Sequence, residues 1–130
     1  LTDKKFYLKH GFKVIDTAFP FFELLYLELK PSAEKPMFTE LAKNGICSEK
    51  AGFSFYFSNQ CPFMEEYVYF MAEILKSRNL AFKINKIESL EQAKNVPVAF
   101  GTFGIFYNGK FVSHELMAEK KFNEFIDKLI

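Results

Sequence analysis

The sequence predicts an α/β fold, in which strands and helices alternate along most of the chain. Three kinds of observation support this prediction. Short apolar runs have the length of buried strands, longer segments repeat their apolar residues at helical spacing, and turn or capping residues separate the two. The resulting order is β-α-β-α-β-β-α over residues 53–129, after a helix and two strands within residues 2–29. This order is typical of a small sheet that begins with parallel strands and ends in a hairpin, with helices on both faces.

The first helix and the first two strands precede residue 30. Residues 2–10 are predicted to be helical, and Gly11 is a suitable C-terminal stop. Residues 12–18 and 21–29 predict two strands, with a turn at Phe19-Pro20 between them. Two strands and one helix leave an open sheet edge. We therefore expect this part to pack on the rest of the chain, to pair in a homodimer, or to depend on a missing N-terminal segment.

A polar segment separates this part from the rest of the chain. Residues 30–36 contain two prolines in seven positions, a composition that is typical of a linker. We therefore predict a first domain in residues 1–30, a linker in residues 31–36 and a second domain in residues 37–130. Because Leu1 falls inside a helical pattern, we also expect the chain to be a piece of a longer protein.

The second domain is predicted to alternate strands and helices. Asn44-Gly45 would end a short helix over residues 37–43, and Asn108-Gly109 is a strong hairpin signal. Ser89 opens a capping-box pattern before another short helix. The remaining elements are, in order, strand 53–57, helix 62–78, strand 80–87, the short helix ending at residue 94, strand 103–107, strand 110–113 and helix 117–129. The first two of these strands should be parallel, because a helix connects them.

Two of these helices carry an apolar stripe at helical spacing. In helix 62–78 the predicted stripe comprises Phe63, Tyr67, Phe70, Met71 and Ile74. In helix 117–129 it comprises Phe122, Phe125, Ile126 and Leu129. The chain has 18 phenylalanines and no tryptophan, so we expect a core built on phenylalanine.

The composition narrows the classes of function. The formal net charge is +1 and there is no basic block, so nucleic acid is not an expected partner. The apolar runs are far shorter than the roughly 20 residues of a membrane helix, so no membrane segment is expected. There is no signal-peptide pattern, and the spacing of Cys47 and Cys61 fits neither a zinc site nor a disulfide framework. We therefore expect a reducing, cytoplasmic compartment.

The turn after strand 53–57 holds the most distinctive side chain, the thiol of Cys61. It stands directly before Pro62 and a predicted helix, where the first N–H groups and the helix dipole favour a thiolate. Three residues later the sequence has Met64 and not a second cysteine. Cys61 is therefore either a reactive thiol or a retained, partly buried small residue. Cys47 follows a helix stop without any motif, and we expect it to be structural.

The segment Phe6-Tyr7-Leu8-Lys9-His10-Gly11-Phe12 resembles the FYxKxGF segment near the end of GNAT-family N-acetyltransferases. In that family the segment ends the last helix and leads into the last two strands, in the order predicted here. The resemblance implies transfer of acetyl from acetyl-CoA to an amine of unknown identity, with Tyr7 as the acid that protonates the leaving coenzyme A thiolate. The pyrophosphate loop of the family, Arg/Gln-x-x-Gly-x-Gly/Ala, is absent from all 130 residues. The resemblance thus implies that a missing N-terminal acetyltransferase segment binds most of the acetyl-CoA.

A second resemblance covers about residues 37–130. The segment 58–63, the stretch 96–112 and the closing helix are similar to the YoaP-like domain found at the C-terminus of some bacterial GNAT proteins. That domain is similar in plan to glutaredoxin, so the resemblance implies a thioredoxin-like fold. Two departures argue against a glutathione-type site. Met64 replaces the resolving cysteine of dithiol glutaredoxins, and Pro97 precedes the third strand by several residues instead of directly.

Three functions remain open on the sequence. The chain can be the C-terminal portion of an N-acetyltransferase that carries a thioredoxin-like accessory domain. Its folded unit can instead be a non-catalytic module that gates substrate access or binds a partner, or a monothiol oxidoreductase acting through Cys61. We expect His10 and His114 to cap the ends of a helix or strand or to face solvent. No carboxylate pair, triad spacing or metal cluster stands out in the sequence.

Overall fold

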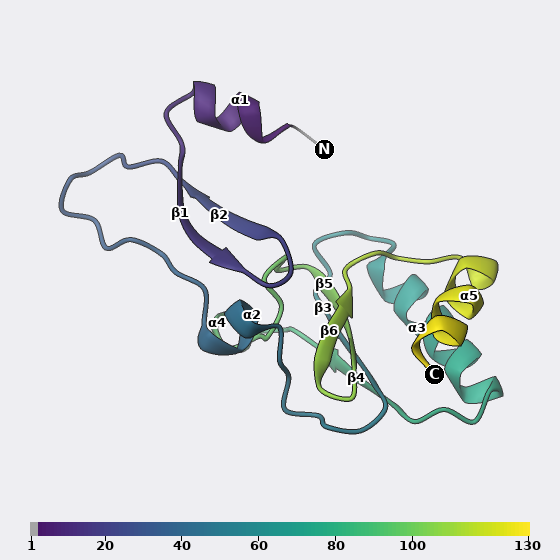
Figure 1. The fold of residues 1–130 in the computed structure, drawn as a ribbon. Helices are drawn as coiled ribbons and strands as arrows, with labels where there is room; N and C mark the ends of the chain where they lie inside the picture. The colour runs from purple at the N-terminus through teal and green to yellow at the C-terminus, as the bar shows by residue number, and fades with distance from the viewer. Residues whose placement is uncertain (1–2) are drawn as a thin grey trace.

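The computed structural model describes residues 3–130 and contains two separate β-sheets (Figure 1). Its first part is α1 (Lys4–Lys9) followed by a hairpin of β1 (Lys13–Ala18) and β2 (Phe22–Tyr26). The second part contains a four-stranded sheet and the other helices. These elements are α2 (Glu40–Asn44), β3 (Phe53–Phe57), α3 (Met64–Ser77), β4 (Phe82–Lys86), α4 (Leu90–Lys94), β5 (Phe103–Tyr107), β6 (Lys110–Ser113) and α5 (Glu119–Leu129). The protein is thus a mixed α/β structure, as predicted.

The N-terminal hairpin is shorter than its sequence pattern suggested. Helix α1 begins at Lys4, and residue 2 of the predicted helix lies outside the described residues. Strands β1 and β2 pair antiparallel, and their last pair is Lys13 opposite Tyr26. Strand β2 ends there and not at residue 29, because β1 offers no further partner. Residues 27–39 form an irregular, largely exposed segment that includes the predicted linker.

The larger sheet has the strand order β4-β3-β5-β6. Strands β3 and β4 are parallel, with Phe55 opposite Ile84, as expected for strands joined by a helix. Strand β5 runs antiparallel to β3, and β6 runs antiparallel to β5. The turn between the last two strands has φ values of 48° at Asn108 and 84° at Gly109, the positive angles that a tight two-residue hairpin turn requires. The predicted bounds of β3, β5 and β6 are confirmed.

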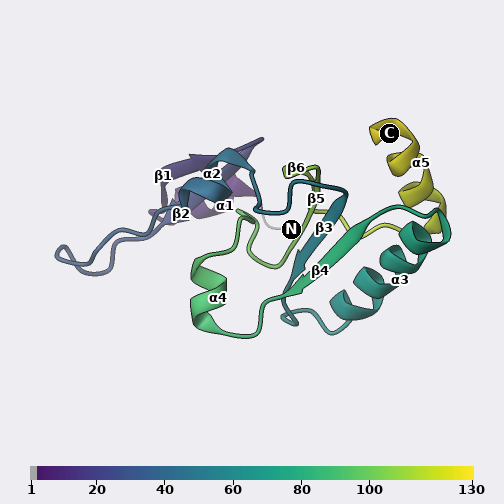
Figure 2. The same ribbon diagram turned by 90° about the horizontal axis from the view of Figure 1, so that it is seen from below.

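The two faces of this sheet are covered differently (Figure 2). On one face α3 and α5 pack on β3 and β5, where Phe55, Ile105 and Phe122 are fully buried. The other face carries a smaller cluster around Phe106 and Phe111. The hairpin and the short helices α1, α2 and α4 lie on that side. Because alternate residues of a strand point to opposite faces, β5 contributes Ile105 to one cluster and Phe106 to the other.

The apolar stripe predicted for α3 is wrong at three positions. Phe63, Tyr67 and Phe70 are 62%, 41% and 42% exposed. The buried face instead comprises Met64, Val68, Met71, Ala72 and Leu75. Both sets have helical spacing, so periodicity alone does not decide between them. The Met64 N–H donates to the Cys61 carbonyl at 3.2 Å, and this tight turn delays the helix until Met64.

The stripe predicted for α5 is confirmed. Phe122 and Ile126 are fully buried, and Phe125 and Leu129 pack against the same cluster. The helix begins at Glu119, two residues later than predicted. Within residues 3–130, none of the helices is both long enough and apolar enough to cross a membrane.

A largely buried carboxylate, Glu49, ties the loop before β3 to the sheet. It accepts hydrogen bonds from Lys83 Nζ at 2.6 Å, from the Tyr56 hydroxyl and from Ser48 Oγ at 2.9 Å. Burial opposes the ionisation of Glu49, but these hydrogen bonds outweigh burial and lower the pKa of Glu49 to about 2. The carboxylate therefore stays ionised in the folded protein under mildly acidic conditions.

We expect Glu49 to make the free energy of unfolding depend on acid pH. Its folded pKa lies below the ordinary value of 4.5, so its stabilisation is complete above that value and is lost as the pH falls toward 2. Glu49→Gln should lower the free energy of unfolding at neutral pH by on the order of 1 kcal/mol and weaken the acid dependence in urea titrations. Glu73→Gln, at an exposed carboxylate, is the control. An unchanged acid dependence in Glu49→Gln would refute this role.

Candidate functional site

Tyr7, the predicted acetyltransferase acid, lies half-buried on α1, far from the four-stranded sheet (Figure 1). Its ring packs edge-on against Phe6 and Phe12, with ring centroids 5.6 and 5.4 Å apart. The Phe12 N–H also donates to the Tyr7 carbonyl at 3.1 Å. These contacts fix the ring relative to the start of the hairpin. The contacts with Phe6 and Phe12 thus give the phenol of Tyr7 a defined position.

Cys61 lies half-buried in the turn between β3 and α3, against the core that α3 and α5 cover. Helix α3 begins at Met64, and its N-cap residue Phe63 has no side-chain cap. Cys61 was predicted to stand directly before the helix, but the helix begins only at Met64, so the sulfur lies farther from the helix N-terminus than predicted. This matters because the field of a helix terminus falls off within about one turn. Met64 is 6% exposed, so the position of a resolving cysteine belongs to the core.

Cys47 cannot complete a dithiol site with Cys61. It is fully buried on the opposite face of the sheet, beside Phe106 and Phe111. Its thiol donates to the Glu49 carbonyl at 3.4 Å, and burial raises the pKa of Cys47. Because the sheet separates the two sulfurs, they cannot form an intramolecular disulfide in the folded protein. This placement agrees with the structural role predicted for Cys47.

We expect the two thiols to differ strongly in reactivity. In the native protein Cys61 should react with a thiol reagent such as dithionitrobenzoate, while fully buried Cys47 should react about a hundredfold more slowly or only after unfolding. Cys61→Ser, which removes the fast phase alone, is the matched control for Cys47→Ser. If both thiols of the native protein react with the reagent at the same rate, Cys47 is not buried as described.

The structure does not bring Tyr7 and Cys61 into one site. Helix α1 lies beyond the hairpin, and α3 lies on the other side of the larger sheet in both views (Figures 1 and 2). His10 forms the C-cap of α1, and its Nδ1 lies 2.8 Å from the Phe6 carbonyl, as expected for a capping residue. The two candidate side chains therefore support separate hypotheses.

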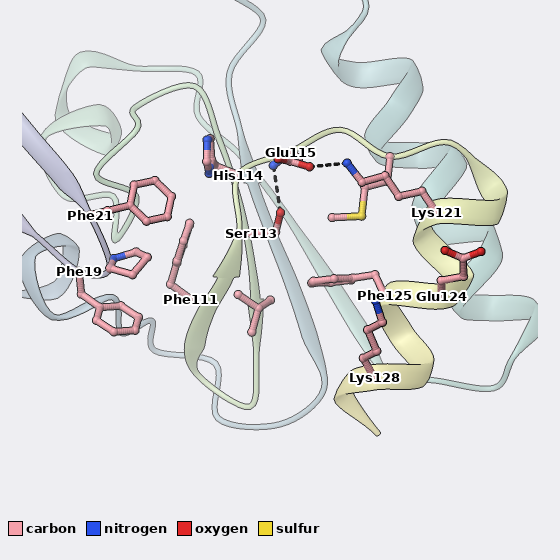
Figure 3. A pocket seen from close by; sticks show the side chains of 13 residues that line it. Phe19, Phe21, Phe111, Ser113, His114, Glu115, Lys121, Glu124, Phe125 and Lys128 are labelled. Atoms are coloured by element: carbon pink, nitrogen blue, oxygen red, sulfur yellow. Dashed lines mark hydrogen bonds and ion pairs between the residues drawn. The ribbon is translucent and has the colours of Figure 1, made fainter. Parts of the chain in front are cut away.

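A cleft of about 540 Å³ lies between the β1–β2 turn and α5 (Figure 3). Phe19 and Phe21 of the turn form one wall, Phe111 of β6 lies between the walls, and Phe125 of α5 forms the other. The rim carries polar groups, including an ion pair between Glu115 and Lys121 at 2.5 Å. The hydrogen bond from Lys121 lowers the pKa of Glu115. The volume and the mostly aromatic walls fit a binding site for an apolar group.

His114 is the residue in this cleft that sequence reasoning missed. Its ring centroid lies 5.3 Å from that of Phe22 and 5.0 Å from that of Phe100. Instead of facing solvent as expected, it forms part of a half-buried aromatic cluster between the hairpin and the larger sheet. No local pattern carries this signal, because Phe22 and His114 are far apart in the sequence. In the part of the chain that the structure describes, no cluster of metal-ligating side chains occurs.

The described residues do not fit the pyrophosphate of acetyl-CoA. Such groups typically bind where helix N-terminal amides point at the ligand. The two long helices begin with acidic side chains instead, Glu65 and Glu66 in α3 and Glu119 in α5, which repel phosphate. A hydrogen bond from Lys86 lowers the pKa of Glu65 and keeps this charge in place. Neither long helix thus offers a phosphate site.

Comparisons with known proteins relate the chain to an acetyltransferase. Residues 81–124 match the family model described as YoaP-like. Over 129 residues the chain is 33% identical to the uncharacterized N-acetyltransferase YoaP of Bacillus subtilis (strain 168). This alignment covers 99% of the chain and 51% of that protein, so the chain spans about half the length of its curated relative. No solved structure matches the chain.

Proposed function

We propose that this chain is the C-terminal part of an acetyl-CoA-dependent N-acetyltransferase. The observation that carries the proposal is the 33% identity, along nearly the whole chain, to a protein named as an N-acetyltransferase. The relative is about twice as long, which leaves room for a separate acetyl-CoA-binding segment. The acetyl acceptor would be an amine, and the compartment would be the cytoplasm, where two free cysteines stay reduced.

Within this proposal the chain has two domains joined by the linker 31–36. Residues 1–30 would be the end of the GNAT acetyltransferase fold, supported by the order of helix, Gly11 and antiparallel hairpin. Residues 37–130 would be a thioredoxin-like accessory domain. The sheet order β4-β3-β5-β6, with one parallel pair at β3–β4 and with α3 and α5 on one face, supports this assignment.

The catalytic contribution of this chain would be the Tyr7 phenol. A tyrosine hydroxyl can donate a proton to a leaving thiolate, and general acids of this kind speed reactions substantially. The packing of the Tyr7 ring against Phe6 and Phe12 supports a fixed orientation of that hydroxyl. Acetyl-CoA itself would be held mainly by residues outside this chain, since neither long helix offers a phosphate site.

The competing redox hypothesis rests on the partial exposure of Cys61. With Met64 buried and Cys47 behind the sheet, Cys61 could exchange only with an external thiol. Cys61→Ser separates the hypotheses, because it should abolish thiol exchange and leave acetyl transfer unchanged if Tyr7 is the acid.

The proposed function is tested first by the gene and by the intact mass of the native protein. We expect a coding segment of about the length of this chain upstream of Leu1, containing a strand, an Arg/Gln-x-x-Gly-x-Gly/Ala loop and a helix. A native protein with the mass of this chain alone would overturn the proposal.

A further inference from the structure

The tip of the β1–β2 hairpin is bound to the second domain by polar contacts. The Phe19 N–H donates to the Lys43 carbonyl at 2.9 Å. The Asp16 carboxylate accepts from Lys43 Nζ at 3.0 Å and from the Phe38 N–H at 3.0 Å, and only 11% of the Asp16 side chain is exposed. The hydrogen bond from Lys43, with those from the Phe38 and Thr17 amides, lowers the pKa of Asp16. A single carboxylate of β1 therefore holds one group near the end of the irregular segment, the Phe38 amide, and one on α2, the Lys43 ammonium.

Aromatic packing completes the same interface. The Phe19 ring lies over Gly45, where an added Cβ would come within 2.8 Å of the ring. Phe22 packs against Phe111 and His114, with ring centroids 5.6 and 5.3 Å apart. This is the face of the larger sheet that no long helix covers. The hairpin thus supplies apolar cover that the second domain lacks.

Contacts continue from this interface to Tyr7. Lys4 of α1 forms an ion pair with Glu23 of β2 at 2.6 Å. Phe12, directly before β1, packs against the Tyr7 ring, and the Phe12 N–H donates a hydrogen bond to the Tyr7 carbonyl. A hairpin held at its tip therefore also limits the positions of the helix that carries Tyr7.

We propose that residues 37–130 act as a clamp that holds the β1–β2 hairpin and thereby positions Tyr7. The clamp contacts are those of Asp16, Phe19 and Phe22 with Lys43, Gly45 and Phe111. This assigns the second domain a positioning role in place of chemistry of its own. The holding of the hairpin stands on the contacts alone, whereas the positioning of Tyr7 rests on the proposed function.

The holding of the hairpin is tested by amide hydrogen exchange of Phe19, measured by NMR on the whole chain. Asp16→Asn and Lys43→Gln remove the ion pair and leave both backbone partners of the Phe19–Lys43 hydrogen bond in place. Each should speed exchange of the Phe19 amide about tenfold or more, while amides of β3 and β5 keep their rates. Lys43→Arg, which keeps the cation, and Glu28→Gln, at an exposed carboxylate just after β2, are the controls. Unchanged Phe19 exchange in both test variants would overturn the clamp.

The positioning of Tyr7 is tested by kinetics of the full-length protein. Asp16→Asn and Lys43→Gln should lower kcat about tenfold and leave KM for acetyl-CoA unchanged, whereas Lys43→Arg should keep the kcat of the wild type. Wild-type kcat in both variants, despite faster Phe19 exchange, would overturn the positioning role and leave the holding intact. A full-length protein without any acetyl transfer would overturn the proposed function instead, because the exchange result does not depend on activity.

Discussion

Replacing Tyr7 by phenylalanine should lower kcat of the full-length protein by about a hundredfold or more, the range expected for loss of a general acid. The aromatic ring and its contacts with Phe6 and Phe12 remain in this variant, so only the proton donor is removed. KM for acetyl-CoA should stay within about twofold of the wild-type value, because the phenol acts on the leaving group and does not contribute to binding. Steady-state kinetics with a range of primary amines gives both values.

Two further measurements separate proton donation from packing. Tyr67→Phe removes an equally small polar group from an exposed tyrosine of α3, and it should leave kcat unchanged. Urea unfolding of Tyr7→Phe should match that of the wild type, because the ring and its packing against Phe6 and Phe12 remain. A Tyr7→Phe variant with wild-type kcat would remove Tyr7 from the mechanism.

Truncating Phe122 to alanine should give the largest loss of stability in the chain, about 3–5 kcal/mol. Phe122 is fully buried and lies among Phe53, Phe55 and Phe125, where α5 closes the core. A domain of this size is typically stable by about 5–15 kcal/mol, so the variant should lose a large fraction of its stability. Urea unfolding followed by circular dichroism measures the change.

Phe63→Ala is the matched control for this prediction. Phe63 is 62% exposed, although its sequence spacing placed it in the apolar stripe of α3. Its truncation should change the free energy of unfolding by no more than about 0.5 kcal/mol. Equal losses in the two variants would mean that α3 buries the face that the sequence pattern indicated, and the entry of the chain at Met64 would have to be revised.

The larger sheet was predictable because its signals are local. Continuous apolar runs mark β3 and β5, and Asn108-Gly109 fixes both the turn and the register of the last hairpin. The buried face of α3 was not predictable, because Phe63 and Met64 begin two apolar series with the same period. In the structure the series that begins at Met64 is the buried one. The sequence pattern contains both faces, and the packing of α3 on the rest of the core separates them.

The candidate site residues also divide into those that the sequence predicted and those that it did not. Tyr7 and Cys61 were found from short motifs, although the helix that was predicted to follow Cys61 directly begins only at Met64. The interface of Asp16 with Lys43 and the aromatic cluster at His114 were not found, since each joins segments that lie far apart in the sequence. The structure shows the hairpin packed on the part of the chain that holds the larger sheet, which is one of the arrangements expected for it. Such contacts depend on the tertiary fold and leave no periodic signal.

The most direct test of the central claim is to incubate the full-length protein with acetyl-CoA and a panel of primary amines, and to detect acetylated amine by mass spectrometry. This readout avoids thiol reagents, which the half-exposed Cys61 would consume. We expect acetylated product in proportion to enzyme concentration, and its loss in Tyr7→Phe. If no amine is acetylated and calorimetry detects no binding of acetyl-CoA, the acetyltransferase claim is contradicted, and residues 37–130 are better described as a binding module.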